Sequence, residues 1–201
     1  MAAKPDQFAE VILATSRAEF MRYGFEGTDV SRIARLCGIG TTTFYRLFSD
    51  KTDVFLAIYR DWESNEQHAM RRLLCGRGSI ASLVDAFVER YRCHTPFRRS
   101  LRRLGHDEPR VRQAVGASRR ARLRQIRNWR GSSLEADSGE LAAQLILFEG
   151  LLTALSEADL TEMGADDGRV RQLLGEILSN WRFEDMSDGR GATTAIKGTL
   201  E

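Results

Sequence analysis

The spacing of apolar residues along the chain predicts a protein built almost entirely of helices. Apolar positions recur every three or four residues in stretches that glycines, prolines and polar clusters separate, whereas strand-like alternation is scarce. The stretches with this helical period are 6–23, 28–37, 41–48, 51–74, 80–94, 96–105, 107–129, 140–158 and 170–181. The pattern therefore predicts an all-α fold.

The stretch from Thr28 to Lys51 predicts two short helices joined by a tight turn. Thr28 can accept a hydrogen bond from an orphan backbone N–H and so cap the first helix. Gly38 can take the left-handed conformation that a sharp exit from this helix needs. Gly40 is an acceptable N-cap for the second helix, which we expect over 41–48.

The second of these helices is expected to present short polar side chains at its N-terminal end. Its apolar residues face inward, which leaves Thr41, Thr42, Thr43 and Tyr45 outside. This geometry is typical of a helix-turn-helix, whose second helix enters the DNA major groove N-terminus first. A threonine hydroxyl can bond a base edge or a phosphate. The residues alone also allow a helical corner of an all-α core whose threonines have no binding role.

This stretch resembles the DNA-binding signature of the TetR family of bacterial repressors. The matching positions are Ile33, Ala34, Gly38, Ile39, Phe44, Tyr45, Phe48 and Lys51. The departures are Cys37, Gly40, Thr42 and Leu47. The resemblance implies DNA contacts by Thr28, Thr41, Thr42, Thr43, Tyr45, Arg46 and Lys51. Tyr45 and Lys51 are then expected to bind phosphates, whereas a solvated surface charge is the plainer interpretation of Lys51.

The resemblance also implies a division of the chain into two domains. Residues 1–50 form a three-helix DNA-binding head, and residues 51–183 form a larger helical body for ligand binding and dimerisation. The helix expected over 51–74 is long enough to connect the two. Residues 184–201 have little periodicity and are expected to be a disordered tail.

The last two predicted helices are candidates for a dimer interface. The helix over 140–158 is apolar around most of its circumference, so it must be covered on more than one side. Paired with their symmetry mates, two such helices make a four-helix bundle, as the resemblance implies. The expected interface residues are Leu145, Leu152, Leu155, Leu173, Leu174, Ile177 and Trp181. A purely intramolecular core is the alternative.

The arginines are concentrated in one segment. Fourteen of them lie between Arg90 and Arg130, opposed by only Asp107 and Glu108, although the whole chain has a formal net charge of only +2. This segment could be a second nucleic-acid surface, attract an acidic ligand, or form ion pairs. Residues 135–185 carry twelve acidic residues and three arginines. We therefore favour pairing within or between subunits.

The sequence offers no constellation for catalysis. It has no phosphate-binding loop, nucleophile elbow or CxxC pair, and its three histidines lack metal-ligand spacing. The expectation is a protein that is not an enzyme and needs no metal or cofactor. Three widely separated cysteines argue against a disulfide framework and are expected to be buried thiols. Without a signal peptide or a membrane-spanning apolar run, the chain is expected in the cytoplasm.

The leading hypothesis is a ligand-responsive homodimeric repressor that binds a palindromic operator in double-stranded DNA. The resemblance places a small-molecule pocket among the body helices, and its candidate lining residues are Trp62, Phe87, Tyr91, Phe97, Trp129 and Phe148. Core packing explains each of these equally well. The alternatives are a DNA-binding regulator without a small-molecule effector, and a helical interaction module that has lost DNA binding.

Overall fold

The computed structural model describes residues 5–130, 138–157 and 159–181, which contain ten helices and no strand. The helices are α1 (Pro5–Tyr23), α2 (Val30–Leu36), α3 (Thr41–Leu47), α4 (Lys51–Leu74), α5 (Ile80–Arg92), α6 (Thr95–Asp107), α7 (Pro109–Arg130), α8 (Ser138–Ser156), α9 (Asp159–Glu162) and α10 (Gly168–Trp181). The all-α prediction is confirmed; only the short α9 was not expected. The predicted tail lies outside the described residues.

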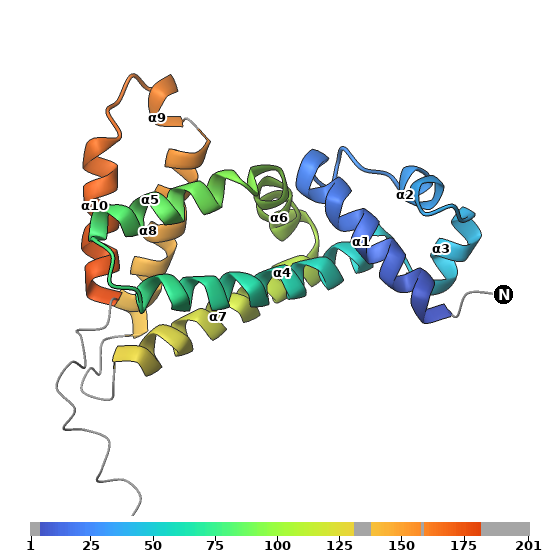
Figure 1. Ribbon diagram of the computed structural model, residues 1–201, viewed down its shortest axis with the longest axis horizontal. Coiled ribbons are helices and arrows are strands. Elements are labelled where there is room, and N and C mark those ends of the chain that lie inside the picture. The colour runs from blue at the N-terminus through green and yellow to red at the C-terminus, as the bar shows by residue number, and fades with distance from the viewer. Residues whose placement is uncertain (1–4, 131–137, 158, 182–201) are drawn as a thin grey trace, which may run out of the picture.

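Helices α1, α2 and α3 form a small head at one end of the molecule, and α5 and α8–α10 lie towards the other end (Figure 1). The head closes around aromatic rings. Phe20 and Phe55 meet edge to face at 5.4 Å, and the side chains of Ile33 and Phe44 are completely buried beside them. These residues anchor α2 and α3 on α1 and on the first turns of α4.

The capping of α2 differs from the prediction. Asp29 is the N-cap, and its Oδ1 accepts the N–H of Arg32 at 2.7 Å. Thr28 is instead only 1% exposed, and its hydroxyl donates to the carbonyl of Gly24 at 2.9 Å. The expected cap at Thr28 was therefore wrong by one residue, because its side chain closes the preceding corner. The exit at Gly38, with φ of 67°, is confirmed.

Helix α4 belongs to both halves of the molecule. Asp50 caps it by accepting the N–H of Asp53 at 2.8 Å. Its early residues, among them Phe55 and Ile58, are buried in the head core, whereas Met70 and Leu74 are buried in the core of the body. The prediction that this helix connects the two domains physically is consistent with this burial.

The body core lies between α5, α8 and α10, and it contains most of the residues that were expected at a dimer interface. These are Leu145, Leu152, Leu155, Leu174, Ile177 and Trp181, each no more than 7% exposed in the single chain. Leu173 alone is partly exposed. In the single chain these six side chains pack within the body core, because the periodic stripe on which they lie faces the chain's own α5.

Helix α8 also corrects the expectation that no segment could cross a membrane by length and composition. Its window Gly139–Ser156 has a mean hydropathy of 1.3, although only 28% of it is buried. One side of the helix lies in the body core. Ile146 and Leu147 remain 62% and 49% exposed on the other side.

The cysteines also differ from the prediction. Cys75 and Cys93 are exposed, contrary to the expectation of buried thiols.

A second contact joins the head to the body through α6. The backbone N–H of Phe25 donates to Ser100 Oγ at 2.7 Å, in the corner between α1 and α2. Gly24 has φ of 73°, and a Cβ built there would lie 2.8 Å from Ser100 Oγ and 3.3 Å from the carbonyl of Pro96. Glycine is therefore needed both for its backbone conformation and for the close approach of α6.

Replacing Gly24 tests this close approach. We expect Gly24→Ala to lower the free energy of unfolding by about 2–4 kcal/mol, since a positive φ and an overpacked contact are both penalised. Gly38→Ala is the matched control, because Gly38 has a similar φ but nothing within 4 Å of its Cβ position. It should lose only about 1–2 kcal/mol. Equal losses in urea unfolding would contradict the account.

Candidate nucleic-acid interface and ligand cavity

The outer surface of the head carries the side chains of α3 that the sequence singled out. Thr41, Thr42 and Arg46 are exposed, Tyr45 is 55% exposed, and Thr43 is half-buried. Phe44 is completely buried between them and fixes the helix on the head. The structure therefore brings five of the seven expected DNA-contacting residues onto one short helix at the end of the molecule (Figure 1).

Of the other two expected contacts, Thr28 is buried in the head and Lys51 is half-buried. The buried Thr28 has no surface to offer to DNA, so we remove its side chain from the candidate interface. Lys51 Nζ donates to the carbonyls of Phe25 and Thr28, both at 2.7 Å, and lies 3.8 Å from the centre of the Phe25 ring. Burial lowers the pKa of Lys51. Its amine thus ties α4 to the corner before α2, a role that the sequence did not indicate.

A substitution at Lys51 separates this structural role from a phosphate contact. Lys51→Met should lower the free energy of unfolding by about 1–3 kcal/mol, because two backbone carbonyls lose a charged donor. Arg46→Met, on the exposed face of α3, is the control and should change stability by less than about 0.5 kcal/mol. An unfolding curve unchanged by Lys51→Met, together with a weaker salt dependence of DNA binding, would restore the phosphate role.

The body contains a cavity of about 570 Å³, bounded by residues of α4, α5, α6, α7 and α8. Trp62 and Tyr91, two of the six residues proposed for a ligand pocket, line this cavity. Phe87, Phe97 and Phe148 do not; they are buried in the two cores, where Phe87 and Phe148 pack edge to face at 5.3 Å. The side chain of Trp129 lies outside the described residues. Additional apolar lining comes from Tyr59, Leu101, Val115 and Ile146.

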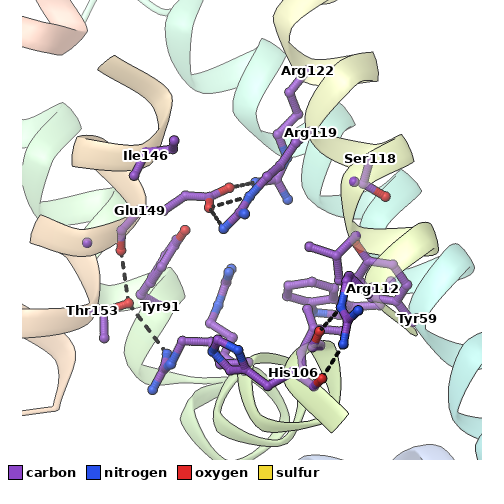
Figure 2. A pocket seen from close by; sticks show the side chains of 18 residues that line it. Tyr59, Tyr91, His106, Arg112, Ser118, Arg119, Arg122, Ile146, Glu149 and Thr153 are labelled. Atoms are coloured by element: carbon purple, nitrogen blue, oxygen red, sulfur yellow. Dashed lines mark hydrogen bonds and ion pairs between the residues drawn. The ribbon is translucent and has the colours of Figure 1, made fainter. Parts of the chain in front are cut away.

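Arginines line the same cavity, and the search for aromatic residues missed them. They are Arg98, Arg102, Arg112, Arg119 and Arg122, and the one carboxylate in the lining is Glu149. Figure 2 shows Glu149 reaching from α8 towards Arg119 and Arg122, with Arg112 and His106 on another side of the cavity. The arginine-rich composition of 90–130 was the available signal, but composition did not show that these side chains converge.

Ion pairs hold many of these arginines, which confirms the expectation of pairing within the chain. Arg122 Nη2 lies 2.5 Å from Glu63 on α4, and its Nη1 lies 2.8 Å from Glu149 on α8. Arg119 binds the second oxygen of Glu149 at 2.7 Å. Burial disfavours the charge of Arg122, yet the neighbouring carboxylates outweigh burial and raise its pKa. The network therefore links α4, α7 and α8 across the cavity wall.

Comparison with known proteins shows which family the head resembles. Residues 12–58 match the model of the bacterial regulatory proteins of the tetR family, whereas no curated protein matches the chain. The fold resembles that of a tetR-family regulator from Mesorhizobium loti (16% identity, TM-score 0.57, covering 90% of this chain and 97% of the other). It also resembles GusR from Salmonella enterica (17%, 0.57, 89% and 97%) and a TetR-family regulator from Agrobacterium tumefaciens (18%, 0.54, 88% and 98%).

Proposed function

We propose that the chain, whose residues 12–58 match the tetR-family model, is a DNA-binding transcriptional regulator of the TetR family and acts as a homodimeric, ligand-responsive repressor of a palindromic operator. It acts in the cytoplasm, where its DNA is found. The observation that carries this proposal is the exposed polar face of α3, held outward by the buried Phe44. Thr41 and Thr42 then read base edges in the major groove, and Tyr45 binds a phosphate.

Substitutions on α3 distinguish base reading from phosphate binding. DNA selected from a random pool by Thr41→Ala or Thr42→Ala should differ in sequence from that selected by the unaltered protein. Each should weaken binding to the original operator roughly tenfold, as expected for a lost base contact. Tyr45→Phe should instead weaken binding to all sequences about fivefold, because one hydrogen bond is lost.

Thr161→Ala, an exposed threonine of α9, is the matched control and should leave both affinity and sequence preference unchanged. If gel retardation detected no duplex retained by the unaltered protein from the random pool, the chain would instead be a helical module that has lost DNA binding. If the α3 variants selected the same DNA as the unaltered protein, the threonines would not be the reading residues.

The outward side of α8 is the best candidate for the dimer interface. Ala143 and Leu147 are exposed there, one helical turn apart, and the exposed Ile146 and Gly150 beside them border the cavity, while the opposite side of α8 lies in the body core. Small and branched apolar residues on one exposed face are suited to close packing against a second helix. A two-fold axis beside this face pairs α8 with its symmetry mate. This exposed face of α8 takes the place of the buried leucines that the sequence analysis assigned to the interface.

A charge at Leu147 tests this interface. Leu147→Glu should raise the dimer dissociation constant by roughly a hundredfold, because the contact would bury an unpaired carboxylate. Leu36→Glu is the control, since Leu36 is 52% exposed on α2 and lies away from α8. Sedimentation should show dimers for the control and monomers for Leu147→Glu. Dimers in both would exclude this face of α8.

The position of the cavity supports a response to a ligand. Its wall includes Leu101 and Gly105 of α6, the helix whose Ser100 accepts the backbone N–H of Phe25 in the head. It also includes Tyr59 and Trp62 of α4, which enters both cores. A ligand that favours another arrangement of α6 and α4 shifts the spacing of the two heads, and the operator is released. A regulator without an effector would have no use for this cavity.

A further inference from the structure

The polar groups around the cavity are mostly donors of hydrogen bonds. Five arginines and Trp62 offer N–H groups, against one carboxylate, that of Glu149. Arginine and the indole of tryptophan have no acceptor atoms for hydrogen bonds. A ligand that fills this space must therefore supply acceptors.

Positive charge around the cavity also exceeds the available negative charge. Six arginines share four carboxylates among the described residues. Glu66 pairs with Arg90 and Arg98, Glu157 with Arg99 and Arg102, Glu149 with Arg119 and Arg122, and Glu63 with Arg122. A seventh arginine, Arg112, has no such partner in the described part of the chain. Arg112 binds only the carbonyls of Gly105, at 3.0 Å, and His106. No carboxylate of the described residues neutralises it.

Two buried donors of the lining have no hydrogen-bond partner in the part of the chain that the structure describes. Trp62 Nε1 and Arg98 Nε form no hydrogen bond, although the two side chains are only 4% and 9% exposed. An unsatisfied buried donor costs about 1–3 kcal/mol, and both nitrogens are shielded from solvent, so a ligand acceptor reaches them only if the cavity wall adjusts. The guanidinium of Arg98 lies 3.6 Å from the centre of the Tyr91 ring and 4.6 Å from that of Trp62, which fixes it in place.

We propose that the cavity binds a small organic oxyanion with an apolar, ring-sized body, and that this anion is the effector. The inference rests on the proposed regulatory function and names the chemical class of its ligand. Arg119 binds the oxyanion, since a guanidinium matches a carboxylate or a phosphate with two parallel hydrogen bonds. Arg112, on another side of the cavity, adds a positive charge that attracts the anion. Tyr59, Val115 and Ile146 contact the apolar body. The volume of about 570 Å³ is ordinary for such a molecule.

The anion competes with Glu149 for the same guanidinium groups. Arg119 donates to Glu149 through Nε at 3.0 Å and Nη2 at 2.7 Å, in the geometry that a ligand carboxylate would adopt. Arg122 holds Glu149 with one nitrogen and Glu63 of α4 with two others. An anion that displaces Glu149 therefore breaks the ion pairs between α8 and α7 and changes the charge balance at α4.

Two fluorescent probes with the same body test the proposal. 8-Anilinonaphthalene-1-sulfonate carries an oxyanion, and N-phenyl-1-naphthylamine is its neutral counterpart. Fluorescence titration of the full chain should show the sulfonate binding at least roughly tenfold more tightly, because the arginines contact only the charged probe. Competition with naphthalene-1-carboxylate and with 1-naphthyl phosphate then distinguishes a carboxylate site from a phosphate site.

Substitutions in the cavity wall test whether the sulfonate probe binds in the cavity. Arg112→Gln should weaken the sulfonate roughly tenfold and change the neutral probe by less than about twofold. Glu149→Gln should have the opposite effect and tighten the sulfonate several-fold, since the competing carboxylate is removed. Arg124→Gln, an exposed arginine of α7 outside the lining, is the matched control and should have no effect. Circular dichroism confirms that each variant remains folded.

Equal affinity for the two probes, no binding of either, or binding that is indifferent to Arg112→Gln and Glu149→Gln would overturn the proposal. Gel retardation of selected DNA by the same preparations separates this result from a failure of the proposed function. A protein that retains DNA but shows no preference for the anion is a regulator with another kind of effector. A protein that retains no DNA contradicts the regulatory role itself.

Discussion

The burial of α4 in two separate cores is the constraint on which the rest of the structure depends. Its first turns complete the aromatic core of the head, and its last turns complete the leucine-rich core of the body. A helix fixed at both ends cannot move at one end without a response at the other. The contact of Ser100 with the corner at Phe25 adds a second connection, so the orientation of α3 depends on the packing of α4 and α6 together.

Charge is distributed in the body in a way that serves both stability and binding. Arginines of α5, α6 and α7 reach carboxylates on α4, on α8 and directly after α8. Of these carboxylates, Glu66, Glu149 and Glu157 are each shared by two arginines. Exposed pairs contribute little to stability, but a buried one such as Arg122 with Glu63 is costly to break. The excess of guanidinium groups remains at the cavity. The same network therefore holds the helices and attracts an anion.

The helices and the exposed face of α3 could be predicted from the sequence alone, because both depend on local features: the period of the apolar residues and the glycines at which helices end. The sequence was insufficient where two interpretations share one pattern. Thr28 and Asp29 are both good caps, and only the contact of Thr28 with Gly24 decides between them. The leucines of α8 and α10 have the spacing of an interface, yet they pack against α5. The clustering of arginines at a cavity depends on contacts between distant residues, which periodicity does not encode.

The most direct test of the central claim is hydroxyl-radical footprinting of the protein on DNA selected from a random pool. Two outward helices related by a two-fold axis should protect two inverted half-sites on one face of the duplex, with centres about one helical turn, or a small multiple of it, apart. Thr41→Ala should weaken both protected patches on this DNA together. A single protected patch, or protection without inverted symmetry, would contradict the account of α3 as one half of a two-fold DNA-binding surface.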